Sequence, residues 1–160
     1  MQKIVTFLWF DDKAEEAANF YVSVFKDARI TNISRYGEAG PGPKGRAMTV
    51  NFELAGQQFM ALNGGPHFAF TPAISLLVNC ESQQEVDDLW DKLLAGGGQK
   101  SRCGWLQDKY GLSWQIIPTA LGKLMGDPDP EKSKRVMQAM LQMDKIDIAK
   151  LEQAHRGESR

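Results

Sequence analysis

The chain repeats itself, and this repeat is the strongest constraint on its fold. The segment TFLWFDDKAEEAANFYVSVF, which begins at Thr6, aligns with SLLVNCESQQEVDDLWDKLL, which begins at Ser75, at a constant shift of 69 residues. Each segment begins with a short continuous apolar run. After it, apolar residues recur every three or four positions. This order is typical of a strand followed by an amphipathic helix. The chain is therefore predicted to build two similar modules.

A later part of each half also matches, at a shift of 55 residues: Gly56 and Met60 fall on Gly111 and Gln115. The loop 37–46, which has no counterpart of similar composition in the second half, explains much of the change in shift. Each half then consists of a strand, a helix and about three more strands. We interpret the chain as one domain, 1–160, made of module 1 (3–65), module 2 (70–118) and a C-terminal helical tail (119–157).

Strands are expected wherever alternating or apolar runs are bounded by turn residues. In the first half these runs lie at 3–10, 28–36, 47–55 and 57–63. In the second half they lie at 73–80, 99–105 and 112–118, with a weak strand before Asp108.

Each module helix is predicted to begin with a capping box, formed by Asp12 with Glu15 and by Ser82 with Glu85. Helical spacing in the tail predicts one helix around Val136 and a shorter one behind Asp147.

Charge and composition argue against several classes of partner. The net charge is −1 and Lys and Arg are scattered along the chain, which gives no basic surface for a nucleic acid. No apolar run reaches about 18 residues, so we expect no membrane partner and a cytoplasmic protein. Two cysteines, Cys80 and Cys103, fit a reducing compartment.

Three phrases, LNGGPHFAF, CGWLQDKYGLSWQIIP and AMLQMDKIDIAKLEQA, together with the paired βαβββ pattern, resemble a known family. This is the PhnB-like branch of the vicinal oxygen chelate superfamily, to which glyoxalase I, extradiol dioxygenases and bleomycin resistance proteins belong. Members of the branch often carry the label 3-demethylubiquinone-9 3-methyltransferase. The resemblance implies an α+β fold, in which two βαβββ modules wrap their sheets into an open cup with helices outside and further helices at the C-terminus.

Side chains along a strand alternate between two faces, so the implied cup predicts which of them face the cup and which face the helices. In the first strand, Thr6 and Leu8 are predicted to face the cup, whereas Phe7 and Trp9 are predicted to face the helices. In the second module, the residues predicted to face the cup are Ala73, Ser75, Leu77, Asn79 and Gln115.

In metal-using members of the superfamily, the ligands come from the first and last strand of each module. Carried over, that pattern falls on Thr6, Met60, Ser75 and Gln115. Zinc is bound by Cys, His or carboxylate groups, and harder divalent ions are bound by anionic oxygens. Two hydroxyls, a thioether and an amide supply no charge, so we predict no metal and no other cofactor.

The sequence thus predicts a metal-free homodimer that binds a small, largely apolar or aromatic molecule in the cup. Gln115, whose amide can donate and accept hydrogen bonds, and Ser75 are the expected polar contacts. The full set of candidate ligand-binding residues is Thr6, Leu8, Met60, Ser75, Leu77, Trp105 and Gln115. An apolar stripe in the tail is the expected dimer clasp.

Two kinds of enzyme and an interaction module remain as alternatives. A methyltransferase would bind S-adenosylmethionine, and a lyase or dioxygenase would bind a divalent metal. The segment GPGPKG (40–45) matches G-x-G-x-x-G, but a strand-like sequence follows it, so we expect a hairpin loop. An interaction module would fill the cup with its own side chains.

Other reactive residue types are expected to be structural. Glu53 and Asp108 hold matching places before a glycine and are predicted to stabilise turns. Cys80 is predicted to be a buried small apolar residue, and His67 and His155 to have surface or capping roles.

Overall fold

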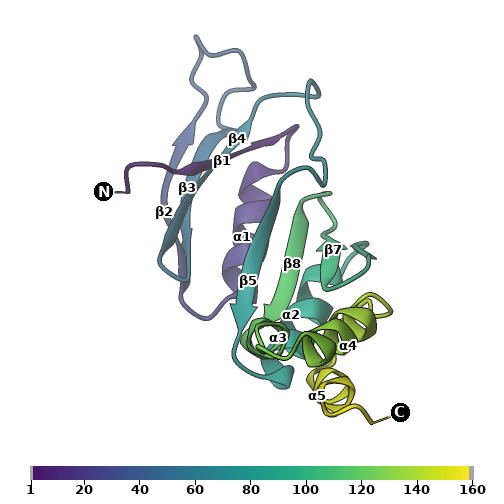
Figure 1. Cartoon of the computed structure of the whole chain (residues 1–160). Coiled ribbons are helices and arrows are strands. Elements are labelled where there is room, and N and C mark those ends of the chain that lie inside the picture. The colour runs from purple at the N-terminus through teal and green to yellow at the C-terminus, as the bar shows by residue number, and fades with distance from the viewer. Residues whose placement is uncertain (1, 159–160) are drawn as a thin grey trace. The chain divides into compact units, whose positions relative to one another are not determined.

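The computed structural model describes residues 2–158, which form two compact units, one ending at Phe70 and one beginning at Thr71. Each unit contains a four-stranded mixed sheet, with a helix between its first two strands in chain order (Figure 1). The predicted α+β class with two βαβββ modules is confirmed. No helix within residues 2–158 is long and apolar enough to cross a membrane.

The first unit consists of β1 (Thr6–Phe10), α1 (Ala14–Val24), β2 (Ala28–Arg35), β3 (Ala47–Leu54) and β4 (Gln57–Asn63). The strand order is β1-β4-β3-β2, with β1 parallel to β4 and the other pairs antiparallel. Tyr21 of α1 stacks on Phe52, with ring centroids 6.1 Å apart, and Phe52 stacks on Phe59 at 5.3 Å. These three rings form the core between α1 and the sheet.

The second unit contains β5 (Ser75–Cys80), α2 (Gln83–Leu94), β6 (Gln99–Lys100), β7 (Trp105–Gln107) and β8 (Ser113–Pro118). The strand order β5-β8-β7-β6 repeats that of the first unit. Trp114 and Ile116 of β8 are buried, as are four apolar residues of α2, namely Val86, Leu89, Trp90 and Leu93. The weak strand predicted before Asp108 is β7, whereas the strand predicted at 99–105 is reduced to the two residues of β6.

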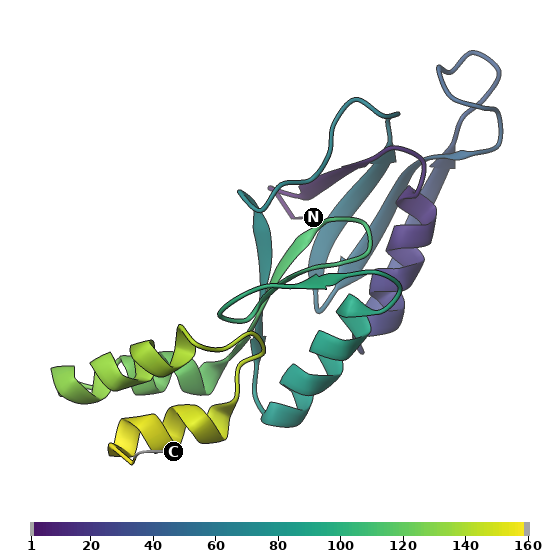
Figure 2. The ribbon, with the colours of Figure 1, turned by 90° about the vertical axis from the view of Figure 1, so that its right-hand side faces the viewer.

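The tail forms three helices, α3 (Thr119–Met125), α4 (Pro130–Met140) and α5 (Ile148–Arg156), of which only α3 was not predicted. The three pack on one another in Figure 2, around a core of Leu121, Val136, Met143, Ile146 and Leu151.

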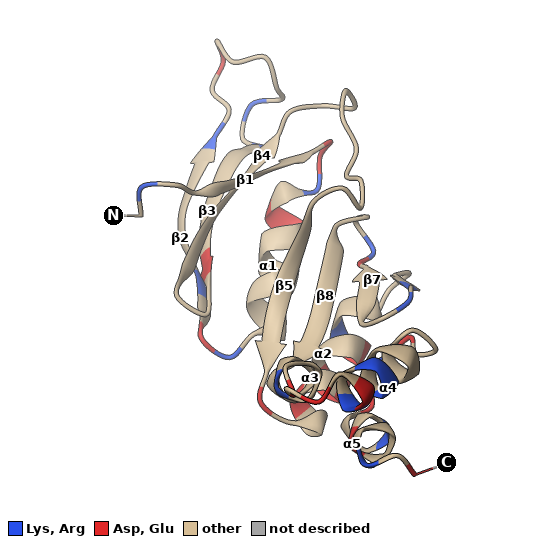
Figure 3. Cartoon of the chain, viewed as in Figure 1, with Lys and Arg blue, Asp and Glu red and all other residues tan. Residues whose placement is uncertain are grey.

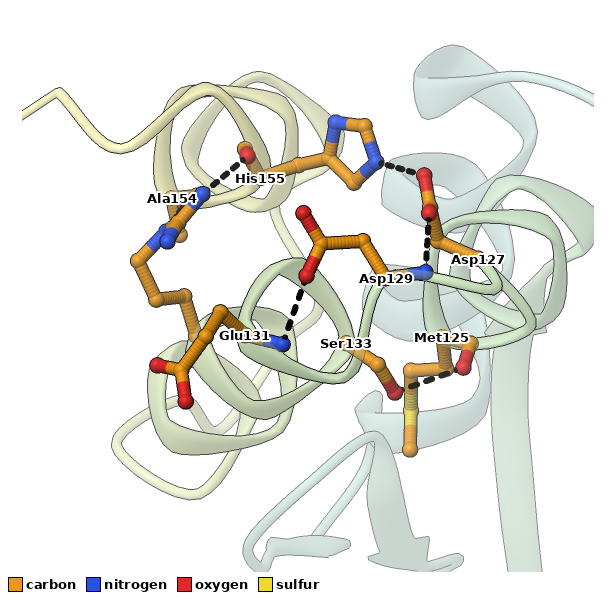
Figure 4. A network of polar contacts seen from close by, with 8 residues as sticks. Met125, Asp127, Asp129, Glu131, Ser133, Ala154 and His155 are labelled. Carbon is orange, nitrogen blue, oxygen red and sulfur yellow. Dashed lines mark hydrogen bonds and ion pairs between the residues drawn. The ribbon is translucent and has the colours of Figure 1, made fainter.

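Polar bonds tie the tail together and to α2. Gln83 donates to Ile146 O at 2.9 Å and accepts from Ile148 N at 2.7 Å. Within the tail, His155 Nε2 lies 2.8 Å from Asp127 Oδ2 (Figure 4). The backbone N–H of Asp129 and then His155 lower the pKa of Asp127. The tail is therefore an integral part of the second unit.

The two faces of β1 are the reverse of the prediction. Thr6 pairs with Phe59, and Leu8 with Ala61, so both share the face of the Phe59 ring. That ring belongs to the core under α1, and Leu8 is buried. Thr6 and Leu8 therefore point toward the helix, and Phe7 and Trp9 lie on the opposite face.

The reason is one extra residue in the first module. Three residues, 11–13, connect β1 to α1, whereas two, 81–82, connect β5 to α2. The helices are related by a shift of 69, but the strands before them are related by 70. A shift of one residue moves every side chain of a strand to the other face. Val5 and Phe7, rather than Thr6 and Leu8, are thus the counterparts of Ser75 and Leu77.

One of the two predicted capping boxes is wrong. At α2, Ser82 Oγ accepts from Glu85 N at 3.1 Å, as a capping box requires, and the Glu85 carboxylate accepts from the backbone N–H of Glu81, one residue before the N-cap, at 2.7 Å. At α1 the N-cap residue is Lys13, whose side chain makes no capping bond, and within the described residues Asp12 makes none either. The Oδ1 atom of Asn63, at the end of β4, accepts from Ala14 N at 2.8 Å instead.

Candidate functional site

We call the face of each sheet opposite its module helix the open face. On the open face of the second sheet, Gln115 pairs with Trp105 on one side and with Leu77 on the other. Three of the predicted ligand contacts therefore lie in one row across β7, β8 and β5. Leu77 is 51% exposed, and Trp105 and Gln115 are half-buried. The row combines an aromatic ring, an amide and an aliphatic side chain, all within reach of a molecule on this face.

The amide of Gln115 is held by a predicted neighbour. Its Nε2 atom donates to Ser75 Oγ at 2.9 Å. Within residues 2–158 its Oε1 atom accepts no hydrogen bond, so the amide offers an acceptor beside Leu77. This bond fixes the amide's orientation, which is what a specific polar contact requires.

Ser113 adds a second polar group on the same face, two residues before Gln115 on β8. It pairs with Ser75 and with Gln107. Its side chain is buried, and within residues 2–158 its Oγ has no hydrogen-bond partner. Buried hydroxyls are generally paired, so Ser113 is an exception within the described residues, and its oxygen is closed to a molecule on this face. Ser113 is not among the residues that the sequence predicts for the site.

Asp108 stabilises the turn that positions β8. Its Oδ1 accepts from Tyr110 N at 2.8 Å and Leu112 N at 3.1 Å, and its Oδ2 accepts from Trp114 Nε1 at 2.9 Å. The predicted turn role is confirmed. The bond to the indole holds Trp114 on the helix face, and alternation then places Gln115 on the open face.

The open face of the first sheet is more aromatic. Phe7, which is 52% exposed, pairs with Met60, and Trp9 pairs with Leu62. Met60 also lines a pocket of about 360 Å³ together with Val5. Phe7 and Trp9 were not among the predicted contacts, because the one-residue difference before α1 was not visible in the aligned sequences.

The five strands β1, β4, β5, β7 and β8 contain no charged residue. In the first sheet, however, Glu53 of β3 and its partner Arg29 of β2 lie on the same face as Met60. In Figure 3 the five strands are tan throughout, whereas Lys, Arg, Asp and Glu lie mainly on helices and loops. The parts of the open faces that these five strands supply are therefore suited to an uncharged molecule.

Comparison with known proteins identifies the family. A sequence model of the 3-demethylubiquinone-9 3-methyltransferase family matches residues 2–117. The PhnB protein from Bacillus cereus is 45% identical, with a TM-score of 0.69, over 74% of this chain and 100% of that chain. The chain belongs to this family, the PhnB-like branch of the vicinal oxygen chelate superfamily. The family match ends at Ile117, so the tail of this PhnB-like chain lies beyond it.

More distant structures share the fold alone. Protein PA1353 from Pseudomonas aeruginosa is 20% identical, with a TM-score of 0.61, over 74% of this chain and 98% of that chain. The fosfomycin resistance protein FosX from Listeria monocytogenes is 15% identical, with a TM-score of 0.51, over 74% of this chain and 93% of that chain. No curated protein matched the sequence.

The positions carried over from metal-using members hold no charged donor in this PhnB-like chain. With the strand register corrected, Val5 replaces Thr6 in that set, beside Met60, Ser75 and Gln115. Within residues 2–158 no three His, Cys, Asp or Glu side chains form a group that could hold a metal ion. Metal-free binding stays a prediction.

The remaining candidate groups have structural partners. Cys80 is fully buried, and burial, followed by the carboxylates of Glu85 and Glu81, raises the pKa of its thiol to about 12. The thiol is therefore protonated at neutral pH and is no nucleophile, as predicted. The ring of His67 lies edge-on to that of Trp9, with centroids 6.5 Å apart.

The GPGPKG segment is a hairpin loop between β2 and β3, as predicted, and β3 rather than a helix follows it. Its second glycine packs against the ring of Tyr36, because a Cβ atom on Gly42 would lie 2.4 Å from Cε2 of that ring. The glycine serves close packing and lacks the helix N-terminus of a dinucleotide-binding loop.

Proposed function

We propose that this PhnB-like chain is a small-molecule-binding protein of the glyoxalase and bleomycin-resistance type that acts without a metal. The row formed by Trp105, Gln115 and Leu77 is the observation that carries the proposal. The ligand lies on the open face of the second sheet, with Gln115 and Ser75 as the polar contacts that orient it. Such a site, mostly apolar with a few placed polar groups, is typical of small-molecule binding.

The ligand is small, uncharged, and largely apolar or aromatic. The absence of charge from β5, β7 and β8 supports this chemistry, because an ionic ligand would lose hydration without gaining a charged partner. The free acceptor of Gln115 suits a hydroxyl or N–H on the ligand.

Replacement of Gln115 by leucine is expected to weaken ligand binding by roughly 10- to 100-fold, because a ligand donor is left without its acceptor. The change keeps the side-chain volume similar and should leave thermal unfolding nearly unchanged. Calorimetric titration of the molecule that co-purifies with the protein measures the effect.

Gln57→Leu is the matched control, since Gln57 is exposed and lies in the first unit. Equal affinity in the Gln115→Leu variant and the wild type would show that the site assignment is wrong.

The family description favours a second candidate, a methyltransferase that uses S-adenosylmethionine. The loop 40–45 is followed by strand β3 and not by a helix, which argues against a dinucleotide-type cofactor loop at this place. Saturable binding of S-adenosylmethionine would favour this candidate.

The other alternative is a metal-dependent lyase or dioxygenase. One FosX structure is a complex with Mn(II) and sulfate. A stoichiometric divalent ion in this protein would favour a metal-dependent enzyme.

We also propose that the protein is a cytoplasmic homodimer whose contact includes α4. Val136 points into the tail core, whereas Met137 and Leu141, one helical turn apart, are 39% and 49% exposed. Two apolar side chains at i and i+4 form a continuous stripe that a second copy can cover.

The double variant Met137→Lys/Leu141→Lys is expected to be monomeric at concentrations where the wild type is dimeric, since four lysines would meet across a two-fold contact. Sedimentation velocity measures the state. Lys132→Glu/Lys134→Glu, on the same helix, controls for a general effect of charge. A dimer that survives the first double change would rule out this surface.

A further inference from the structure

We propose that the open face of the first sheet binds a planar aromatic ring, in a corner formed by Trp9, Phe68 and Phe7. The inference rests on the proposed function in supposing a small-molecule ligand. It goes further in assigning a site to the first unit and a chemical class to its ligand. None of its residues belongs to the Trp105, Gln115 and Leu77 row.

The indole of Trp9 is fixed in place by the segment that follows β4. Its Nε1 atom donates to Gly65 O at 2.9 Å. The backbone at Gly64 lies against the six-membered ring, because a Cβ atom there would be only 2.3 Å from Cζ2. The ring therefore has one hydrogen-bonded edge and little freedom to rotate, so it is preorganised for a partner.

Phe68 stands at a right angle to this indole. The two ring centroids are 4.9 Å apart and the ring planes meet at 82°, while the Phe68 side chain remains 68% exposed. His67 adds a third ring at 6.5 Å from Trp9. A planar molecule can stack on one wall of such a corner and meet the other wall edge-on, which are the two favoured geometries of aromatic pairs.

Phe7 extends the corner along β1. It lies on the same face as Trp9, two residues earlier, or about 6.6 Å along the strand. Its strand partner is Met60, and Leu62 is the partner of Trp9. Methionine sulfur and aromatic rings attract one another, and neither β1 nor β4 carries a charge. The surface thus selects for flat, polarisable, uncharged ligands over saturated ones of equal size.

The test compares two probes of matched size and hydrogen bonding, 2-naphthol, which is planar, and decahydro-2-naphthol, which is saturated. Binding to the full chain is followed by the NMR resonance of the Trp9 indole N–H and by calorimetry. We expect 2-naphthol to shift that resonance and to bind at least about 10-fold more tightly than its saturated counterpart. Phe68→Leu should weaken 2-naphthol binding about 3- to 10-fold, in line with the loss of one aromatic pair.

Phe70→Leu is the matched control, because Phe70 pairs with Phe10 rather than with Trp9 and should leave 2-naphthol binding unchanged. Equal binding of the two probes, no binding of 2-naphthol up to its solubility, or equal effects of Phe68→Leu and Phe70→Leu would each overturn the proposal. So would binding that weakens as the protein concentration rises, which would mean that a second copy covers the corner.

Gln115→Leu, measured with the same probes, separates this inference from the proposed function. A loss of 2-naphthol binding in Phe68→Leu, with none in Gln115→Leu, supports the corner. A loss in Gln115→Leu alone would overturn the corner and leave the second-sheet site standing.

Discussion

Replacement of Asp108 by alanine is expected to lower the free energy of unfolding by about 3–5 kcal/mol, because three donors lose a charged acceptor in a buried site. Asp108 is only 3% exposed, and it accepts from two backbone N–H groups and from the indole of Trp114. Urea denaturation followed by tryptophan fluorescence measures the change. The emission of Trp114 should also shift to the red, because its ring loses the bond that holds it in the core.

Glu53, the counterpart of Asp108 in the repeat, is the natural control. It lies within β3 and pairs with Arg29 at 3.2 Å, and the Arg29 side chain is largely exposed. Glu53→Ala is therefore expected to lower the free energy of unfolding by less than about 1 kcal/mol. Similar losses in the two variants would show that the Asp108 carboxylate is not the anchor of the β8 turn.

Replacement of Asn63 by alanine is expected to lower the free energy of unfolding by about 2–4 kcal/mol, since it removes a helix cap and leaves buried backbone groups unpaired. The Asn63 amide accepts from Ala14 N at 2.8 Å and donates to Ala47 O at 3.0 Å. It therefore ties the start of α1 to the sheet. Hydrogen exchange at the Ala14 amide should become much faster in the variant.

Asp12→Ala tests the alternative, since Asp12 is the residue that the sequence pattern favours as the cap. Asp12 is exposed and makes no capping bond, so its replacement should change the free energy of unfolding by no more than about 0.5 kcal/mol. A large loss at Asp12 with little loss at Asn63 would contradict the observed cap.

The repeat explains why so much of the fold could be predicted. The apolar stripe that relates α1 to α2 at a shift of 69 residues placed both module helices, and the turn glycines Gly56 and Gly111 placed the strands after them. These signals are local, because each depends on the spacing of side chains along one element.

The faces of β1 could not be obtained in the same way. An alignment scored on the helix stripe does not detect a single extra residue between strand and helix, yet that residue reverses which side chains face outward. The alignment therefore predicts Thr6 and Leu8 for the site and Phe7 and Trp9 for the helix face, which is the reverse of the observed faces. Apart from Thr6, β1 is apolar, so the strand has no polar alternation that could have corrected the error.

Contacts between distant segments were equally hidden. Asn63 caps a helix 49 residues earlier in the chain, and Gln83 fastens a tail segment 63 residues later. By contrast, Ser75 and Gln115 could be matched from the sequence, because the order of strands in each module makes β5 and β8 neighbours. The candidate site was thus predictable where it depends on topology and not where it depends on register.

Native mass spectrometry of the protein as purified from cells tests the central claim most directly, because one spectrum reports subunit number, bound metal and any small organic adduct. We expect a dimer without metal that carries an uncharged organic molecule, and loss of that adduct in the Gln115→Leu variant. A divalent ion near one per subunit would contradict this expectation and would make a metalloenzyme the better explanation.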